Sequence, residues 1–425
     1  MPQPAPPTAE ERVFAKIAWR LMPLLTFGYI LNYLDRNNIS FAALTMNREV
    51  GLTATQFGRG AGILFVGYCL FEVPSNLVLY RVGARVWISR IMISWGIVSA
   101  ATIFVAGPYS FYLLRFLLGA AEAGFFPGVA YYLGTWFPAE YRTRMVAWFM
   151  VAIPISSVVG GPVSGLLLQM DGLAGMAGWK WMFLLEGLPV VVVGLAMLRL
   201  LADRPEDAEW LSDAERGIVR ERLAGERRER EVRRLGLALK DARVLVLAGV
   251  QFGFLVGSYG VTIFLPQIIK AGELSDLHVG FVTSGCFALA SIGMIVWAGY
   301  VDRHGGKVLH LTLACLVSAA GFVLSIASGS FWLSIAGITV SLVGINAARG
   351  IFWTIPPRFL TGLAAAGGLA FINSIGTAGG FVGPYVMGWL TDETGSFSAG
   401  LAAMAGFLLV AAALSWSLTR FVTRD

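Results

Sequence analysis

Apolar stretches long enough to cross a lipid bilayer recur along the whole chain. A spanning helix needs about 20 predominantly apolar residues, because each residue advances the helix by about 1.5 Å through a hydrocarbon layer about 30 Å thick. The pattern predicts twelve spans, near residues 19–45, 57–79, 87–106, 110–135, 144–169, 179–201, 243–269, 278–300, 308–327, 331–355, 365–390 and 398–419. We therefore expect an all-α integral membrane protein with twelve transmembrane helices.

The composition agrees with a bilayer as the main solvent. Of the 425 residues, 56% are hydrophobic and 14% are charged, whereas charged residues make up about 25% of soluble domains. The net charge is +6, but the basic residues alternate with the apolar spans and form no continuous patch. This distribution favours a role in membrane topology over a nucleic-acid partner.

The basic residues predict the orientation of the spans. Cytoplasmic connections of membrane proteins carry most of the Lys and Arg. Every second connection is basic here, and these connections carry Arg12, Lys16, Arg20, Arg81, Arg85, Arg142, Arg144, the segment 199–243, Arg303, Lys307, Arg358, Arg420 and Arg424. The opposite connections carry little more than Arg48, Arg59, Lys180 and Lys270. We expect both termini and the loop 202–242 to be cytoplasmic.

An internal repeat divides the chain into two halves. The segment 161–165, Gly-Pro-Val-Ser-Gly, recurs in outline at 383–388, and each copy lies in the fifth span of its half. Two six-span halves related in this way are typical of a transporter with a central binding site. The expected organisation is an N-terminal six-helix bundle (1–201), a cytoplasmic linker (202–242) and a C-terminal six-helix bundle (243–425).

The linker contains a predicted amphipathic helix. Ser212 followed by Glu215 matches a capping box, in which each side chain bonds the other residue's backbone N–H. Opposite charges four residues apart then suit a helix with a solvated face. A connector between the bundles is the simpler interpretation, and a helix that contacts phospholipid or regulates transport is the alternative.

Four ionisable residues lie inside predicted spans: Asp35 and Arg36 in the first, and Arg115 and Glu122 in the fourth. A charge at the centre of a bilayer costs on the order of 3 kcal/mol, so it is usually retained where it serves transport. Arg115 and Glu122 are seven residues apart, which places them on one helix face, about 10 Å apart along the axis. These residues indicate a transporter.

Several motifs give the chain a specific resemblance. The segment "GYVDRHGGKV" (299–308) resembles the signature of the major facilitator superfamily, although Leu79-Tyr80 replace the usual acidic residue in the first half. Further segments resemble its anion:cation symporter branch: "NYLDRNNISFA" (32–42), "FEVPSNL" (71–77), "RFLLGAAEAGFFPG" (115–128), "FWTIPPRFLTGLAAAGGLAFINSIG" (352–376) and "GGFVGPYVMGWL" (379–390). That branch includes bacterial permeases for sugar acids, tartrate and aromatic acids, and the sialin-type organic anion carriers. The resemblance implies the major facilitator fold and a bacterial inner membrane.

Two carboxylates are the candidate proton carriers. The resemblance implies that Glu122 and Asp35 are protonation sites and that Arg115 modulates Glu122. Because adjacent residues of a helix point about 100° apart, we expect Asp35 to pair with Arg115 and Arg36 to find another partner. The alternative is that these charges only join helices.

A second group of residues is predicted to bind substrate. Arg349 lies in the tenth span with Trp353 one turn away, and the planar guanidinium of arginine suits a carboxylate. The alternative for Arg349 is snorkelling or a pair with a buried acid such as Glu186. The resemblance places Tyr33, Tyr68, Trp353 and Asn373 at positions that line the central cavity.

A third group has an expected structural or gating role, namely Arg36, Glu72, Arg144, Asp302 and Arg303. Glu72 lies near the cytoplasmic end of its span, where it could pair with Arg90 or Arg144. Such a pair would either open during the transport cycle or simply join two helices.

These features favour a proton-coupled symporter that imports a small organic anion by alternating access. The expected partners are an aromatic acid, dicarboxylate or sugar acid, protons and membrane lipid, and the chain is expected to act as a monomer. A drug/proton antiporter is the alternative, and a transporter-like sensor is a remote one. An enzyme is not expected, and neither is a cofactor or metal, because His278, His304 and His310 lack metal-ligand spacing.

Overall fold

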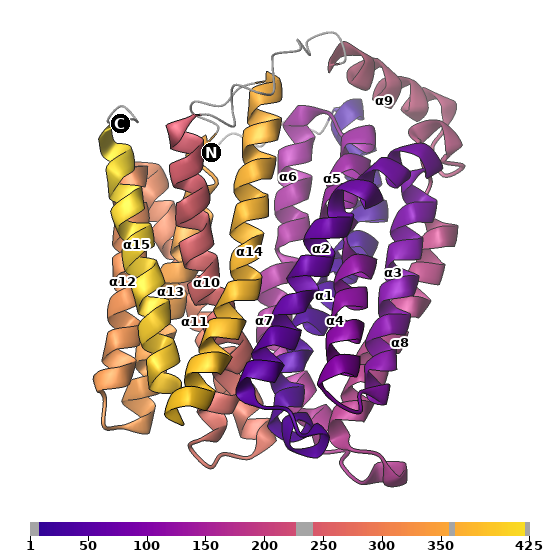
Figure 1. Ribbon diagram of the computed structural model, residues 1–425. Coiled ribbons are helices and arrows are strands. Elements are labelled where there is room, and N and C mark those ends of the chain that lie inside the picture. The colour runs from indigo at the N-terminus through magenta and orange to yellow at the C-terminus, as the bar shows by residue number, and fades with distance from the viewer. Residues whose placement is uncertain (1–7, 227–240, 357–361, 421–425) are drawn as a thin grey trace, which may run out of the picture.

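The computed structural model describes residues 8–226, 241–356 and 362–420, and long helices dominate it (Figure 1). Within these ranges, eleven helical segments are long and apolar enough to span a membrane. A twelfth long helix, α14, packs among them against α2, α10 and α15. The expectation of an all-α protein with about twelve spans is therefore confirmed.

The helices of the first half follow the predicted spans closely. Three of these spans are each built from two consecutive helical segments. In chain order the elements are α1 (Ala9–Val50), α2 (Ala54–Val82), α3 (Ala84–Ala100) with η1 (Ala101–Phe104), α4 (Pro108–Glu122) with α5 (Phe125–Trp136), α6 (Ala139–Met150) with α7 (Ala152–Leu168), and α8 (Gly178–Leu200).

The linker helix and the second half complete the chain. The second half contains six long helices and no broken span within the described residues. The elements are α9 (Asp213–Glu226), α10 (Ala242–Lys270), α11 (Asp276–His304), α12 (Lys307–Ala327), α13 (Phe331–Phe352), α14 (Gly362–Thr394) and α15 (Phe397–Ser417).

The fourth span breaks directly after Glu122. Gly124 adopts a φ of 89°, a left-handed conformation that favours glycine because it has no Cβ. The backbone also passes close to the Ser75 side chain, so that a Cβ on Gly124 would collide with it. This break ends α4 at Glu122 and places the carboxylate at a bend of the span.

The two ends of the helical bundle differ. The helix α9 and the last turns of α15 lie at the top in Figure 1, and α1 contacts α9 there; we call this the linker end and the opposite end the loop end. The alternation of the helices brings the basic connections that contain Arg81, Arg142 and Arg303 to the linker end. The predicted segregation of basic residues is therefore present in the structure.

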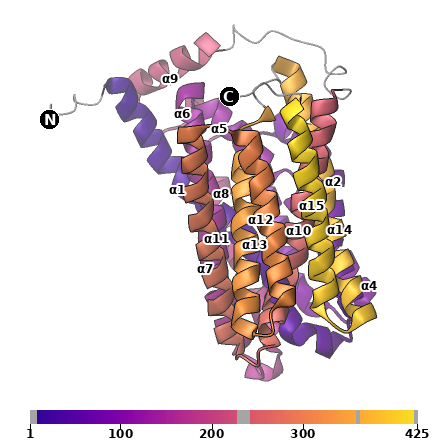
Figure 2. The same ribbon diagram turned by 90° about the vertical axis from the view of Figure 1, so that its left-hand side faces the viewer.

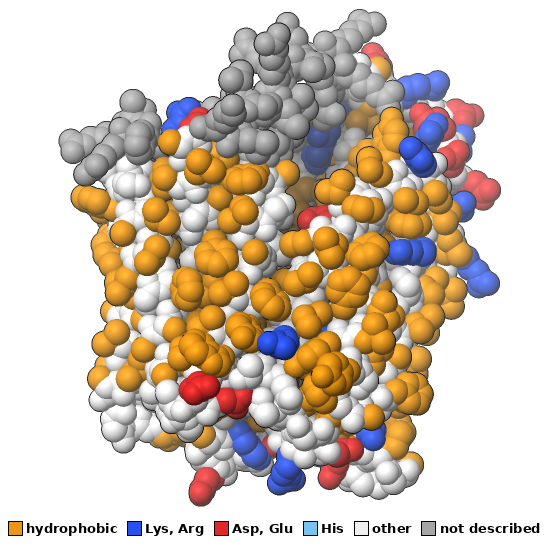
Figure 3. Space-filling view, in the orientation of Figure 1, with side chains coloured by type: hydrophobic (Ala, Val, Ile, Leu, Met, Phe, Trp, Pro, Cys, Tyr) orange, Lys and Arg blue, Asp and Glu red, His pale blue; other side chains and the backbone are white. Residues whose placement is uncertain are grey.

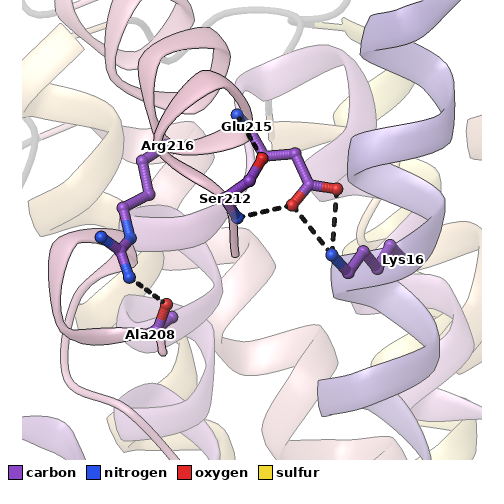
Figure 4. Close-up of polar contacts among 5 residues, drawn as sticks. All are labelled: Lys16, Ala208, Ser212, Glu215 and Arg216. Atoms are coloured by element: carbon purple, nitrogen blue, oxygen red, sulfur yellow. Dashed lines mark hydrogen bonds and ion pairs between the residues drawn. The ribbon is translucent and has the colours of Figure 1, made fainter. Parts of the chain in front are cut away.

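The predicted capping box is present at the start of α9, and Lys16 of α1 joins this helix to the linker end of the bundle (Figure 4). The Glu215 carboxylate accepts a hydrogen bond from the Ser212 backbone N–H at 2.8 Å, and the Ser212 hydroxyl accepts one from the Glu215 N–H at 3.3 Å. The same carboxylate accepts from Lys16 of α1 at 2.8 and 3.0 Å. The Lys16 hydrogen bond and then the Ser212 N–H lower the pKa of Glu215, which therefore stays ionised at neutral pH.

Within the described residues, helices of the two halves pack most extensively where α2 contacts α14, α7 contacts α11 and α1 contacts α10 (Figure 2). Glycines permit the closest approaches. A Cβ on Gly58 would collide with the Pro384 carbonyl, and one on Gly161 would collide with the Gly280 carbonyl. In each pair these residues lie near the loop ends of their helices.

An acidic residue adds a polar contact at the same end. The Asp392 carboxylate near the end of α14 accepts hydrogen bonds from the backbone N–H groups of Ala54 at 3.0 Å and Thr55 at 2.7 Å. These are free donors in the first turn of α2, where the helix dipole also favours an anion. The two halves are thus joined at the loop end, while Figure 3 shows the surface hollowed between them toward the linker end.

Replacing Gly280 by Ala should weaken the closure at the loop end. The added methyl group meets backbone that cannot move independently, and overpacking of this kind costs about 1–3 kcal/mol. We expect the population to shift roughly fivefold or more toward a state opened at the loop end. Distances between spin labels at Leu173 and Ala271, which lie in loops of the two halves, should lengthen.

The matched control is Gly285→Ala on the same helix, because nothing lies within 4 Å of the position that its Cβ would take. This variant should leave the distance distribution unchanged. Equal distributions for Gly280→Ala and Gly285→Ala would show that the glycine crossing does not hold the loop end closed.

Candidate functional site

The central element of the candidate site is a buried ion pair between the first and fourth spans. The Nε of Arg36 donates to Glu122 Oε2 at 2.7 Å, and Asn32 Nδ2 donates to the same oxygen at 3.2 Å. Asn32 and Arg36 are four residues apart and so share one face of α1. The Glu122 side chain is fully buried and its Oε1 has no hydrogen-bond partner, while 18% of the Arg36 side chain is exposed.

Aromatic rings surround the guanidinium of Arg36. Its central carbon lies 4.9 Å from the ring centre of Tyr68 and 5.7 Å from that of Tyr33. Cations are attracted to the faces of aromatic rings at such distances. Arg36 is therefore held by Glu122 on one side and by two tyrosines from α1 and α2 on the other.

Asp35 lies in a separate polar pocket between α1 and α3. It accepts hydrogen bonds from Trp95 Nε1 at 3.0 Å, from Asn38 Nδ2 at 3.1 Å and from the Ser99 hydroxyl. Trp95 and Ser99 are four residues apart on α3 and face α1 together. The two candidate proton carriers thus occupy different environments, because adjacent positions of α1 carry Asp35 and Arg36 to different faces.

The expected pair of Asp35 with Arg115 is wrong for this structure. Arg115 is buried, forms no ion pair within the described residues, and its Nε and Nη1 lack hydrogen-bond partners. It still interacts electrostatically with Asp35 and Glu122. The pairing differs from the expected one because neutral donors already bind Asp35 and because Arg36 binds Oε2 of Glu122.

In the second half, Arg349 faces α10 rather than an acid. Its Nη2 donates to the Ser258 hydroxyl at 3.0 Å. The predicted alternative, a pair with Glu186, does not form, because Glu186 lies in α8 and accepts a hydrogen bond from Ser164 of α7 at 3.1 Å. Arg349 thus has no carboxylate partner within the described residues.

Sequence reasoning missed Tyr259, the residue that connects the two halves of the site. Its ring centre lies 4.4 Å from that of Phe65 on α2, and the side chain interacts electrostatically with Tyr33, Arg36 and Arg349. The available signal was a tyrosine between small residues in an otherwise apolar span, in the segment Gly257–Gly260.

Two other predicted substrate residues form no hydrogen bond with this network within the described residues. Trp353 follows the last residue of α13, is 38% exposed and contacts Phe352 edge to face at 5.3 Å. Asn373 is half-buried in α14. Within the described residues no hydrogen bond joins either side chain to Arg349.

Of the predicted structural or gating residues, Arg36 pairs with Glu122, whereas the other four form no ion pair within the described part of the chain. Glu72 is half-buried, but Arg90 stacks on Trp87 at 4.3 Å and Arg144 is exposed, so neither pairs with Glu72. Asp302 and Arg303 are both exposed at the linker end of α11. A gate between Glu72 and either arginine is therefore not closed in this conformation.

Replacing Arg36 by Met should destabilise the protein because it leaves Glu122 buried without a cation. Breaking one side of a buried pair costs about 3 kcal/mol or more. The double variant Arg36→Met/Glu122→Gln should lose clearly less than the sum of the two single changes, as measured by reversible unfolding in detergent. Strictly additive losses would show that the two side chains do not stabilise each other.

Comparisons with known proteins agree with this architecture. The model of the Major Facilitator Superfamily matches residues 25–366. Among solved structures, a bacterial homologue of the human lysosomal transporter Spinster, in an inward-facing and occupied conformation, superposes with a TM-score of 0.79 at 17% identity. The alignment covers 95% of this chain and 97% of that one.

Sequence relatives are closer. A proposed tartrate transporter of Agrobacterium vitis is 48% identical over 97% of this chain and 92% of its own length. A quinolone resistance transporter of Acinetobacter baumannii is 40% identical over 92% of this chain and 91% of its own length. The inner membrane transport protein RhmT of Escherichia coli is 35% identical over 96% and 95%, respectively. The chain belongs to the Major Facilitator Superfamily and is a multi-pass membrane transporter, not an enzyme.

Proposed function

We propose that this transporter imports a small organic anion together with protons by alternating access. The observation that carries the proposal is the buried Arg36–Glu122 pair, with a second buried acid, Asp35, next to Arg36 on α1. Arg36 also interacts with Tyr259 of the second half, so the pair lies near the interface between the halves, which we call the seam. Ionisable residues buried in membrane spans mark proton relays and the pathways of charged substrates. The relatives named for tartrate support a carboxylate as the substrate class.

Competition for Arg36 explains how protons and substrate are coupled. When Glu122 is ionised it holds the guanidinium at 2.7 Å. Protonation of Glu122 removes the charge attraction, and Arg36 can then bind the carboxylate of the substrate, which prefers the bidentate fork of arginine. Asp35 is the proposed second proton carrier, and Arg115 adjusts both acids through its charge.

The second half supplies the other end of the proposed substrate site. Within the described residues Arg349 has only a hydroxyl partner, and Tyr259 interacts electrostatically with both Arg349 and Arg36. Two cations on opposite sides of the seam suit a dicarboxylate such as tartrate, although aromatic acids and sugar acids remain in the proposed class. Tyr33, Tyr68, Trp353 and Asn373 are the other proposed contacts.

The proposed setting is the bacterial inner membrane, with both termini and the linker 202–242 in the cytoplasm. The proposed units are the bundles 1–201 and 243–425, acting as a monomer in contact with lipid. In this orientation the linker end is cytoplasmic, so the structure is open to the cytoplasm. Glu72, Arg144, Asp302 and Arg303 then lie on the side that must close when the carrier turns outward.

A drug/proton antiporter is the second candidate. The quinolone resistance relative favours it, since that protein shares 40% of its aligned residues with this chain. Arg36 and Arg349 argue against lipophilic cations as substrates, because both present positive charge at the seam. Drug efflux from cells without any carboxylate uptake would favour the antiporter.

Proton coupling can be tested with tartrate and purified protein in proteoliposomes. An inward-directed proton gradient should drive the accumulation of tartrate. Glu122→Gln should reduce this accumulation at least tenfold but should still exchange internal for external substrate. Uptake that ignores the gradient, or a Glu122→Gln carrier that still concentrates tartrate, would rule out this mechanism.

The anion receptor can be tested by ligand-induced thermal stabilisation against a panel of carboxylates. A ligand that binds the folded state raises its melting temperature by mass action. Arg349→Ala should weaken the binding of the best ligand about tenfold or more, while Arg220→Ala, which removes an exposed arginine of α9, should not. Equal stabilisation of the Arg349→Ala and wild-type proteins would remove Arg349 from the substrate site.

A further inference from the structure

A third buried carboxyl group lies outside the proposed mechanism. Glu186 of α8 is 7% exposed and accepts a hydrogen bond at Oε1 from the Ser164 hydroxyl of α7 at 3.1 Å. Its Oε2 is buried and has no hydrogen-bond partner. A carboxyl group with one neutral donor in an apolar span needs an explanation.

The neighbours of Glu186 supply no positive charge. From α1, the Asn38 amide, which donates to Asp35, also lies beside Glu186, and Asp35 acts on it electrostatically. From α7 it meets the Ser164 hydroxyl. The face of α3 that packs against the adjacent Gly187 carries only small residues, Gly96, Ser99 and Ala100. No ion pair to Glu186 exists within the described residues.

The three buried acids therefore differ in how their charge is compensated. Arg36 pairs with Glu122, and Asp35 has three donors and lies in the field of Arg115. Glu186 has only neutral groups, the Ser164 hydroxyl and the Asn38 amide, beside it, together with a negative neighbour, Asp35. An ionised carboxylate that is buried without a cation is very unfavourable. When two acids lie close together, two negative charges are also unfavourable, so one of the acids keeps its proton.

We propose that Glu186 holds a proton in this conformation and forms, with Asp35, a two-carboxyl proton-binding unit that connects α8 to α1 through Asn38. The neutral Glu186 allows Asp35 to be ionised, because a second negative charge beside Asp35 would oppose its ionisation. The role of this unit in coupling rests on the proposed proton symport, whereas the protonated state of Glu186 does not.

Infrared spectroscopy of the purified full-length protein at neutral pH tests the protonated state. The carbonyl stretch of a protonated carboxylic acid should be present, and it should lose a component in Glu186→Gln, whose amide still accepts from Ser164. Glu186→Met, an uncharged chain of similar length, should lose the same component. Asp35→Asn should retain it. A spectrum unchanged by both Glu186 substitutions, or a component lost only in Asp35→Asn, would overturn the proposal.

The pH dependence of thermal unfolding provides an independent readout. If Glu186 keeps its proton only when folded, the folded state binds more protons than the unfolded state above about pH 4.3, the ordinary pKa of a glutamate, and stability must fall from there until the folded carboxyl group ionises. Glu186→Gln should reduce this decline with rising pH, while Glu209→Gln, which changes an exposed acid, should preserve it. An identical decline in Glu186→Gln and wild type would overturn the proposal. Gradient-independent uptake would instead refute the proposed symport and leave both readouts intact.

Discussion

The buried pair of Arg36 and Glu122 is the interaction on which the rest of the site depends. In a medium of low dielectric constant neither charge is tolerated alone, so each fixes the position of the other. The pair joins α1 to the end of α4, at the point where Gly124 breaks the fourth span. It also fixes the guanidinium that the rings of Tyr33 and Tyr68 contact. The same constraint makes the pair sensitive to a single proton.

Closure at the loop end depends on a different constraint, which is the absence of a side chain at the glycines where helices of the two halves cross. Gly58 against Pro384 and Gly161 against Gly280 bring backbones of opposite halves together, and Asp392 adds hydrogen bonds to the first turn of α2. No comparable contacts join the halves near the linker end within the described residues. A rigid rotation of one half against the other would separate these contacts and leave each bundle intact, as alternating access requires.

Tyr259 connects the charges of the site to the contacts between the two halves. It belongs to the second half, yet its ring packs on Phe65 of α2 and its hydroxyl group lies in the field of Arg36 and Arg349. Movement of one half relative to the other therefore changes the surroundings of both arginines. This position at the seam gives the charges of the site a direct connection to the conformation of the carrier.

The sequence by itself determined the class of protein, the spans, the capping box of Ser212 and Glu215, and the residues that carry charge in the membrane. These follow from local rules, because hydropathy, helix caps and the cost of a buried charge depend on a residue and its near neighbours in the chain. The tertiary structure alone decided the partners: Arg36 rather than Arg115 holds a carboxylate, Arg349 bonds Ser258, and Tyr259 joins the halves. Partners between helices depend on how the helices rotate and cross, and small residues far apart in the sequence set those crossings.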